Sequence, residues 1–413
     1  MVWRAVFVST FPPRRCGVAE FTNDLRSALA DVATEWNTAV CAIDRDGLDY
    51  GPEVLVTIRQ DVREDYARAA RSIARTRPDL VVIEHEFGIF GGPTGCYVLD
   101  LVDGLRSRGI PCVVTLHTVR ADPRQRHVAT SLCDDADLVT VFTHHARGLV
   151  LESGVSEPRR TVVVPHGAPC VLRNPPDSPT GVLAEAMAGL AGARVITSFG
   201  LIKPAKGLEL VIRAMPAITR RHADLHYVVA GATHPEVARR SGEKYRRRLA
   251  ALTAELGMGH RVKFVNEFLS EGQIGWLLGR AELCVTPYLS DEQVSSGVLT
   301  FALAAGCPVV STDYSYARQL LGTNSSRAPG AIVPRRDAAC LAAVITELLA
   351  DPARMAASRA AAQLVGSQLL WPEVARRFAN VLALVRSHRS AARVEPVRRR
   401  HVPPENAASV RGG

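Results

Sequence analysis

The sequence contains little lysine and no long uncharged hydrophobic run. Of its 50 basic residues, 4 are lysines and the rest are arginines. A membrane-spanning helix needs about 18 or more consecutive apolar residues, and no uncharged apolar segment reaches that length. The N-terminus enters an apolar segment without a basic, signal-like start. We therefore expect neither a transmembrane helix nor a signal peptide.

Cysteine is present, but its pattern indicates neither disulfides nor a metal site. The nine cysteines are an odd number and form no C-x-x-C pair. Several of them, such as Cys41, Cys112 and Cys284, lie inside apolar segments and are typical of small core residues. No recognised zinc-binding spacing occurs. We expect no metal site, no disulfide framework and a cytoplasmic location.

The basic charge gathers at the C-terminus. From Arg386 onward there are seven arginines and two glutamates, which is +5 of the net charge of +9. Residues 388–413 have no apolar periodicity, so we expect a disordered basic tail. A solubilising role and contact with an anionic membrane surface, at the inner membrane face, both remain open for this tail. Nucleic acid is not an expected partner, because no aromatic and basic stripe accompanies the charge.

Both halves of the chain begin with an apolar segment, a glycine-containing turn and an amphipathic helix. The first copy covers residues 2–9 and a helix from about Gly17; the second covers residues 193–200 and a helix from about Lys206. Such a unit builds a phosphate-facing crevice in doubly wound folds. Other segments rich in Val, Ile and Leu indicate parallel strands covered on both faces. We predict an α/β protein with two Rossmann-like doubly wound domains that face each other across a cleft.

The rhythm of strands and helices also predicts domain boundaries. Ser270 with Gln273 predicts a capping box, and Asp351 before a proline predicts a second helix start. The expected parts are an N-terminal domain at 1–167, a Pro- and Gly-rich linker at 168–190, a C-terminal domain at 191–370, a helix that crosses back to the first domain at 371–387 and the tail at 388–413.

Candidate ligand-binding residues follow the first predicted strand. The turn holds Arg14, Arg15 and Gly17, and Glu20 lies in the first turn of the helix. A glycine at a helix start lets backbone N–H groups approach an anion, and the two arginines add positive charge. A tight turn alone would also explain the glycine.

Three later strand ends in the first half each carry a histidine. These are His85, which Glu86 follows, then His117 and His166. In open α/β sheets, ligands bind outside the carboxyl ends of the strands. Each residue taken alone is also compatible with a hydrogen-bonded structural histidine or a capped turn. Their recurrence at successive strand ends favours a shared crevice.

The second half offers two candidate phosphate-binding segments. Gly200, Lys203 and Lys206 lie in the turn before its first helix, where Lys206 can reach a diphosphate, although the spacing is not that of a Walker A loop. The other segment offers polar side chains for sugar hydroxyls and hydroxyls with bare N–H groups for phosphate oxygens. It contains Glu292, Gln293, Ser295, Ser296 and Gly297. An ordinary serine N-cap is the alternative for this segment.

Taken together, these residues resemble glycosyltransferase family 4, whose members are retaining enzymes of the GT-B fold. The resemblance covers about residues 3–387 and rests on the order and spacing of the motifs. It implies that Gly17 and His117 lie at the cleft and that Lys206 contacts the donor diphosphate. It also implies that residues 261–288 contact the nucleotide base.

Two positions depart from the family pattern. The family usually has two glutamates separated by seven residues, of which the second holds the donor ribose. In this chain the second is Phe301, and the first falls on Gln293, with Glu292 beside it. The family also often has an arginine where this chain has Leu201, and Lys203 is the candidate replacement. The chain therefore resembles a divergent subgroup.

The resemblance implies a metal-independent hexosyltransferase. It would move a hexose such as mannose or glucose from a nucleoside-diphosphate sugar, a co-substrate rather than a cofactor, to a hydroxyl of a glycan, lipid-linked or small-molecule acceptor. Asp44-Arg45-Asp46 matches the letters of a D-x-D metal motif, but enzymes that use it have one nucleotide domain. A GT-B sugar-nucleotide epimerase or hydrolase and a catalytically inactive sugar-nucleotide-binding homologue remain alternatives.

The implied roles are distributed over both halves of the chain. Catalytic roles fall to His117, Lys206 and Glu292, donor binding to Gly17, Gly200, Lys203, Lys206, Gln293, Ser295, Ser296 and Gly297, and acceptor binding to Arg14, Arg15, Glu20, His85, Glu86 and His166.

Overall fold

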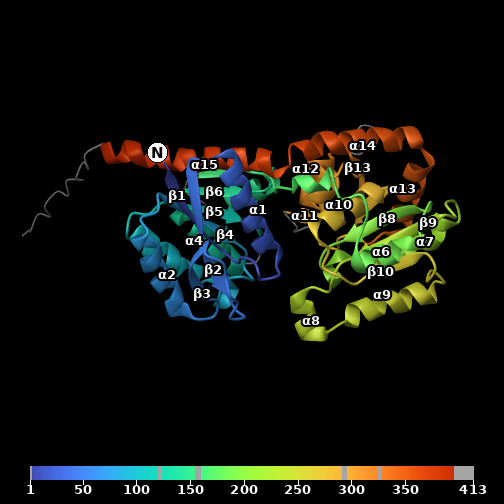
Figure 1. Cartoon of the computed structure of the whole chain (residues 1–413), viewed down its shortest axis with the longest axis horizontal. Coiled ribbons are helices and arrows are strands. Elements are labelled where there is room, and N and C mark those ends of the chain that lie inside the picture. Colours follow the sequence, from blue (N-terminus) through green and yellow to red (C-terminus); the bar gives the residue numbers. More distant parts are fainter. Residues whose placement is uncertain (1, 120–122, 154–159, 291–294, 323–327, 395–413) are drawn as a thin grey trace, which may run out of the picture.

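A computed structural model describes residues 2–119, 123–153, 160–290, 295–322 and 328–394. These residues form two α/β domains that lie side by side (Figure 1). The strands of the N-terminal domain are β1 (Trp3–Ser9), β2 (Trp36–Asp44), β3 (Val54–Arg59), β4 (Leu80–His85), β5 (Cys112–Leu116), β6 (Leu138–Val141) and β7 (Thr161–Val163). Those of the C-terminal domain are β8 (Arg194–Phe199), β9 (Leu225–Ala230), β10 (Val262–Val265), β11 (Leu283–Thr286), β12 (Val309–Thr312) and β13 (Gly330–Val333).

Helices connect these strands on both faces of each sheet. The first half contains α1 (Gly17–Val32), α2 (Arg63–Arg75), the 3-10 turn η1 (Pro93–Gly95), α3 (Val98–Arg106), α4 (Pro123–Asp135), α5 (His144–Glu152), η3 (Cys170–Leu172) and α6 (Gly181–Ala188). The second contains η4 (Pro204–Lys206), α7 (Leu208–Thr219), α8 (Pro235–Ser241), α9 (Lys244–Glu255), α10 (Glu271–Arg280), α11 (Gly297–Ala304), α12 (Ser315–Leu321), α13 (Ala338–Ala350), α14 (Pro352–Ser367) and α15 (Trp371–Val394).

Both sheets are parallel and doubly wound. Their strand orders are β3-β2-β1-β4-β5-β6-β7 and β10-β9-β8-β11-β12-β13. The direction of winding reverses between β1 and β4 in the first sheet and between β8 and β11 in the second. Ligands bind outside the carboxyl ends of strands at such a reversal. The loops after these four strands are therefore where the fold places a site.

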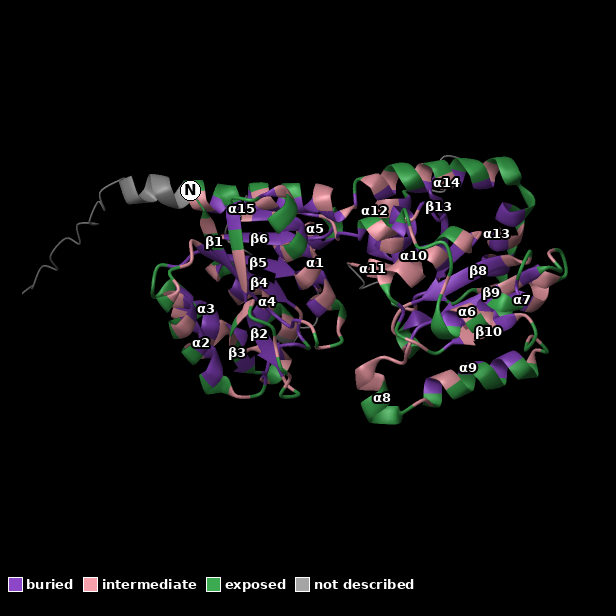
Figure 2. Cartoon of the chain, in the orientation of Figure 1, coloured by how far each residue is buried: buried purple, intermediate pink, exposed green. Residues whose placement is uncertain are grey.

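The hydrophobic core of each domain lies between its sheet and the covering helices. All six residues of β4 and all five of β5 are buried. In Figure 2 the strands are mostly purple, while the outer faces of helices such as α9 and α14 are green. Strands buried on both faces explain the near-continuous runs of Val, Ile and Leu in the sequence.

The last helix, α15, joins the two domains. It starts beside the C-terminal domain and runs along the N-terminal domain, where it packs against α1 (Figure 1). The Phe378 ring lies 6.5 Å from that of Phe7 in β1. Trp371 Nε1 donates a hydrogen bond to Asp24 in α1 over 3.1 Å. The burial of Phe378 and its neighbours therefore attaches the end of the chain to the first domain.

Three boundaries differ from those expected. The final helix extends to Val394 rather than ending at 387, since the end of a helix is poorly described by the periodic pattern of its apolar residues. The linker at 168–190 is partly helical and contains η3 and α6. The first helix of the second domain begins at Leu208, since Lys206 closes a 3-10 turn and Gly207 adopts a left-handed conformation at the N-cap.

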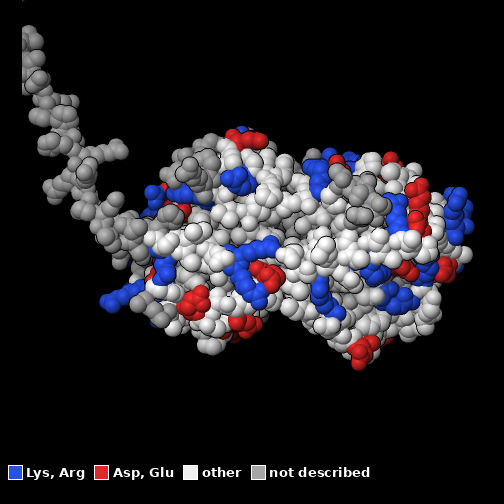
Figure 3. Space-filling model, turned by 90° about the horizontal axis from the view of Figure 1, so that it is seen from above, with Lys and Arg blue, Asp and Glu red and all other residues white. Residues whose placement is uncertain are grey.

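The surface carries charges of both signs. On the face seen in Figure 3, basic and acidic side chains are interspersed rather than gathered by sign. Within the described ranges, every helix is too short or too polar to cross a lipid bilayer. The residues after Val394 lie outside the described part of the chain.

Candidate functional site

The loop after β1 leads into α1 and forms one wall of the site. Cys16 caps α1, because its Sγ accepts a hydrogen bond from the Ala19 amide over 3.4 Å. Gly17 is the first residue of the helix, and a Cβ added there would meet nothing within 4 Å. This helix start is therefore open, as an anion-binding N-terminus requires.

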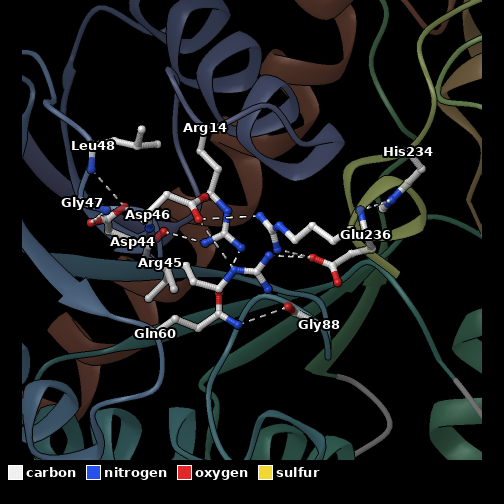
Figure 4. Close-up of polar contacts among 12 residues, drawn as sticks. Arg14, Asp44, Arg45, Asp46, Gly47, Leu48, Gln60, Gly88, His234 and Glu236 are labelled. Atoms are coloured by element: carbon white, nitrogen blue, oxygen red, sulfur yellow. Dashed lines mark hydrogen bonds and ion pairs between the residues drawn. The ribbon is translucent and has the colours of Figure 1, made fainter. Parts of the chain in front are cut away.

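The charged residues of this loop have different environments. Arg14 Nη1 donates to the Ile43 carbonyl over 3.0 Å, and Nη2 donates to Gln60 Oε1 over 2.9 Å, so its guanidinium is held against the ends of β2 and β3 (Figure 4). Arg15 is exposed. Burial raises the pKa of Glu20.

His85 at the end of β4 is not on the surface of the cleft. It is fully buried, its ring stacks on that of Phe90 with the ring centres 5.6 Å apart, and the centre of the Phe87 ring lies 4.8 Å away at nearly a right angle. Neither ring nitrogen has a hydrogen-bond partner within the described residues. Burial and the nearby His117 lower its pKa to about 3, which keeps the ring neutral. The expected direct contact of His85 with an acceptor is therefore not supported, because its ring packs in the core.

Glu86 joins the loops that follow β4 and β5. Its Oε1 accepts a hydrogen bond from the Phe87 amide over 2.9 Å, and its Oε2 accepts one from Thr118 Oγ1 over 2.5 Å. The carboxylate thus holds in place the turn that carries His117.

His117 and His166 meet around an aromatic cluster between the domains. Both rings lie edge-to-face with Phe21 of α1. The ring centre of His117 is 4.7 Å from that of Phe21, and the ring centre of His166 is 5.0 Å from it. His117 Nε2 lies 2.9 Å from Oε2 of the buried Glu84. His166 Nδ1 lies 2.7 Å from the Gly167 carbonyl, and burial lowers its pKa to about 4. The structure therefore brings together two of the three histidines singled out in the sequence.

Lys206 lies at the carboxyl end of β8. Its Nζ donates to the Phe199 carbonyl over 2.8 Å and lies 5.9 Å from the centre of the Tyr288 ring. The residue is only 8% exposed. Burial, followed by the charge of Lys203, lowers the pKa of Lys206 to about 7. This ammonium is poorly solvated, so an anion placed beside it would gain a strong electrostatic partner.

Because Gly200 has no side chain, there is room between Lys206 and the start of α11. The Gly200 φ of +92° lies in a region that favours glycine, and a Cβ built there would be 2.9 Å from Lys206 Nζ and 3.2 Å from Val298 Cγ2. The buried cation and the first turn of α11 therefore flank the same point.

The start of α11 contacts the N-terminal domain. Ser296 is the N-cap, and its Oγ accepts from the Leu299 amide over 3.2 Å. Ser295 Oγ donates to the His117 carbonyl over 3.2 Å. A Cβ added at Gly297 would lie 3.6 Å from His166 Cε1. The serine segment of one domain thus faces the histidines of the other, while Glu292 and Gln293 lie outside the described residues.

A second contact joins the domains at the rim of the cleft. Arg45, in the loop after β2, forms an ion pair of 2.6 Å with Glu236 of α8 (Figure 4). Asp46 lies 3.6 Å from Arg239 on the same helix. Asp44 accepts hydrogen bonds from the loop amides, including that of Gly47 at 3.0 Å. The Asp44-Arg45-Asp46 stretch therefore caps its own loop and pairs with the facing domain.

Phe301 occupies an apolar junction. It is half-buried and packs against Ala168, Leu172 and Ala304, where the linker meets α11. A glutamate at this position would place its carboxylate against these apolar side chains. Within the described part of the chain, no group of three or more His, Cys, Asp and Glu side chains is arranged to hold a metal ion.

Sequence reasoning missed Glu84 and the ion pair at the rim. A signal for Glu84 is present, because a charged residue inside an otherwise apolar strand requires a buried partner. Arg45 and Glu236 are 191 positions apart, and nothing in the pattern relates them.

The arrangement of two facing doubly wound domains is that of the GT-B fold. The Anabaena protein HepE, solved in complex with UDP, superposes with a TM-score of 0.71 at 16% identity over 92% of this chain and 100% of that chain. At 16% identity, this structural similarity establishes the fold alone.

The sequence comparisons find similarity to glycosyltransferases. The profile of the group 1 glycosyl transferases matches residues 189–364. A D-inositol 3-phosphate glycosyltransferase of Thermobispora bispora is 27% identical over 302 residues, which are 68% of this chain and 67% of that protein. A GDP-mannose-dependent phosphatidylinositol monomannoside mannosyltransferase of Mycolicibacterium smegmatis is 24% identical over 57% of this chain and 59% of its own length. The chain is therefore similar to group 1 glycosyl transferases over its C-terminal domain and to named glycosyltransferases over about two thirds of its length.

Proposed function

We propose that the chain transfers a hexose from a nucleoside-diphosphate sugar to a hydroxyl acceptor with retention of configuration. The observation that chiefly supports this is the placement of Lys206 and the α11 N-terminus on two sides of Gly200. A buried cation beside a helix N-terminus is a binding site for a diphosphate. The donor therefore binds the C-terminal domain, and the acceptor enters from the N-terminal domain.

The chemistry of transfer follows from the charge that develops. The bond from the anomeric carbon to the diphosphate oxygen breaks while a bond to the acceptor oxygen forms on the same face. The acceptor proton passes to the departing diphosphate oxygen. Lys206, Lys203 and the amides at the start of α11 stabilise the negative charge that grows on the diphosphate.

The N-terminal domain positions the sugar and the acceptor. The backbone carbonyl of His117 accepts a hydrogen bond from Ser295 of the facing segment. His166 faces Gly297 at the start of α11. Closure of the two domains over the donor keeps water from the anomeric carbon and so favours transfer over hydrolysis.

The nucleotide base is best identified by binding. The name of one relative specifies GDP-mannose, whereas HepE was solved with UDP. A ligand that binds only the folded protein raises its melting temperature, so UDP and GDP are compared first in this way. We expect one nucleotide to stabilise the wild type clearly more than the other.

The activity is tested with the matching nucleotide sugars. UDP-glucose and GDP-mannose are incubated with and without free sugars, inositol phosphates and lipid-linked sugars, and release of nucleoside diphosphate is measured. Release that depends on an acceptor, with the anomeric configuration retained by NMR, supports the proposal. Acceptor-independent release would indicate a hydrolase, and nucleotide binding without turnover would indicate an inactive homologue.

We also propose that transfer needs no metal ion. Lys206 and the α11 N-terminus supply the positive charge that a metal supplies elsewhere. Turnover by protein dialysed against EDTA is therefore expected to match that of untreated protein. Loss of turnover that manganese or magnesium restores would contradict this.

A further inference from the structure

The carboxyl group of Glu84 is buried, and it faces the candidate site residue His117. Glu84 lies near the end of β4 and is 0% exposed. Its Oε2 lies 2.9 Å from His117 Nε2, and within the described residues its Oε1 has no hydrogen-bond partner. A carboxylate taken out of water is costly unless it is paired. His117 is the partner that compensates this one.

We propose that Glu84 is a positioning residue that sets which nitrogen of His117 carries the proton and how the ring is oriented. This inference rests on the proposed function, which places His117 against the bound sugar or acceptor. A carboxylate oxygen can only accept a hydrogen bond, so the 2.9 Å contact places the proton on Nε2 of His117. The neutral ring then has its lone pair on Nδ1.

That tautomer has a consequence for what the site recognises. A lone pair on Nδ1 accepts a hydrogen bond, so it suits a hydroxyl group and does not suit a phosphate oxygen, which is an acceptor as well. Through this tautomer, Glu84 makes His117 Nδ1 a hydrogen-bond acceptor for a hydroxyl group on the sugar side of the cleft. The diphosphate is left to the lysine and helix N-terminus of the other domain.

The surroundings of His117 allow Glu84 to have this effect. The ring is held between Phe21, at 4.7 Å, and Phe142, at 5.0 Å, both nearly edge-on. The His117 amide donates to the His85 carbonyl over 2.9 Å. Packing and the backbone hydrogen bond thus hold the residue in place. The hydrogen bond to Glu84 then determines which ring nitrogen carries the proton. His166 differs, because its Nδ1 contacts a backbone carbonyl.

The first test observes the wild-type protein directly. Nitrogen-15 NMR of protein labelled at histidine distinguishes the two neutral tautomers, and the His117 signals are assigned by their loss in His117→Gln. We expect the neutral ring to be protonated at Nε2. A ring protonated at Nδ1 would overturn the proposal, whatever the activity of the protein.

Substitutions extend this test. Glu84→Gln is nearly isosteric, and we expect the Nε2-protonated form to lose its dominance. Glu64→Gln is the control, because Glu64 is exposed in the first turn of α2, and we expect it to leave the tautomer of His117 unchanged. An unchanged tautomer in Glu84→Gln would count against the proposal.

Kinetics then show whether Glu84 acts through His117. With UDP-glucose or GDP-mannose, whichever the wild type turns over, we expect Glu84→Gln to lower kcat by about 10-fold to 100-fold, the loss typical when the hydrogen-bond partner that orients a functional histidine is removed. Glu84→Asp should recover part of this loss. The double variant with His117→Gln should be no slower than His117→Gln alone.

Failures of the two proposals are distinguishable. Independent, multiplying losses in the double variant would mean that Glu84 does not act through His117. Full activity of His117→Gln, with a wild-type ring protonated at Nε2, would remove His117 from the substrate site and leave its positioning by Glu84 intact.

Discussion

At the scale of single residues, Lys206 is constrained most by its surroundings. Its ammonium is buried, bonded to one carbonyl and adjacent to the first turn of α11. The nearby Lys203 makes the site more electropositive. The protein itself compensates this buried charge poorly, and a bound diphosphate would relieve that cost.

Replacing Lys206 by alanine should lower turnover strongly. We expect a loss of about 10²-fold or more, the scale seen when a preorganised charge-stabilising group is removed. Lys244→Ala is the matched control, because Lys244 is exposed on α9 and should retain turnover close to wild type. Steady-state release of nucleoside diphosphate measures both variants, with circular dichroism to check folding. Near-normal turnover in folded Lys206→Ala would exclude the assigned role.

The depressed pKa of Lys206 predicts how nucleotide binding depends on pH. In the free protein this pKa is about 7, against a usual value near 10.5. A bound diphosphate favours the ammonium form, so above pH 7 binding takes up a proton. Affinity for the nucleoside diphosphate should therefore fall as the pH rises from 7 to 9, by at most about 10-fold per unit. Isothermal titration calorimetry measures this, and Lys206→Met should flatten the dependence.

The same shift affects the stability of the free protein with a defined sign. Between pH 7 and 10.5 the unfolded chain binds a proton at this lysine that the folded protein does not. The contribution of Lys206 to the free energy of unfolding therefore rises with pH over that window.

At the scale of elements, local signals in the sequence were reliable where a helix start is determined by neighbouring residues. The capping box at Ser270 and Gln273 is present, and Asp351 caps α14 with a proline in its first turn. Extents were less predictable. α6 lies inside a stretch expected to be a linker, and α15 continues to Val394. Helix ends depend on packing and on the residues beyond the last turn, which a periodic pattern describes poorly.

Truncation of the C-terminus should separate the packed part of α15 from the rest of the chain. Deleting residues 391–413 should leave the melting temperature unchanged, because that segment shows no apolar face in the sequence. Deleting from 377 removes the buried Phe378, Val381 and Leu382 and should destabilise the protein by several kcal/mol, since loss of one large core side chain costs about 3–5 kcal/mol. Differential scanning calorimetry of both truncations measures the difference. Equal melting temperatures would contradict the packing of α15 on α1.

At the scale of the whole molecule, the contacts between the two domains include a hydrogen bond of 2.7 Å from the His144 amide of α5 to Gln319 of α12 and two contacts at the cleft. One is the deep contact of Ser295 and Gly297 with His117 and His166. The other is the ion pair of Arg45 with Glu236 at the rim (Figure 4). Exposed ion pairs contribute at most about 1 kcal/mol, so the rim contact adjusts closure rather than holding the fold together.

Reversing the charge of Arg45 should open the cleft. Arg45→Glu places two carboxylates opposite each other, and we expect a larger radius of gyration by small-angle X-ray scattering. The double variant Arg45→Glu with Glu236→Arg should return to the wild-type value, and added salt should weaken the effect. Arg63→Glu is the control, because its partner Asp100 belongs to the same domain. Identical scattering from all four proteins would show that the ion pair does not influence closure.

Much of this protein was determined by the sequence alone. The two Rossmann-like domains, the order of strands and helices, the position of His117 at a strand end and that of Lys206 in the turn after β8 all follow from hydrophobic periodicity and turn residues. These signals act over a few residues, within the span that a local pattern describes.

Only the tertiary structure decided how those strand ends are used. His85 and His117 look alike in the sequence, yet His85 is fully buried, whereas the carbonyl of His117 accepts a hydrogen bond from Ser295 of the second domain. Glu84 and His117 are 33 positions apart in the chain. They meet because β4 and β5 are neighbouring strands in the sheet. The pairing of strands and the orientation of the two domains depend on how whole faces of sheets and helices pack against one another. Residues that are distant in the chain come together only once this packing is complete.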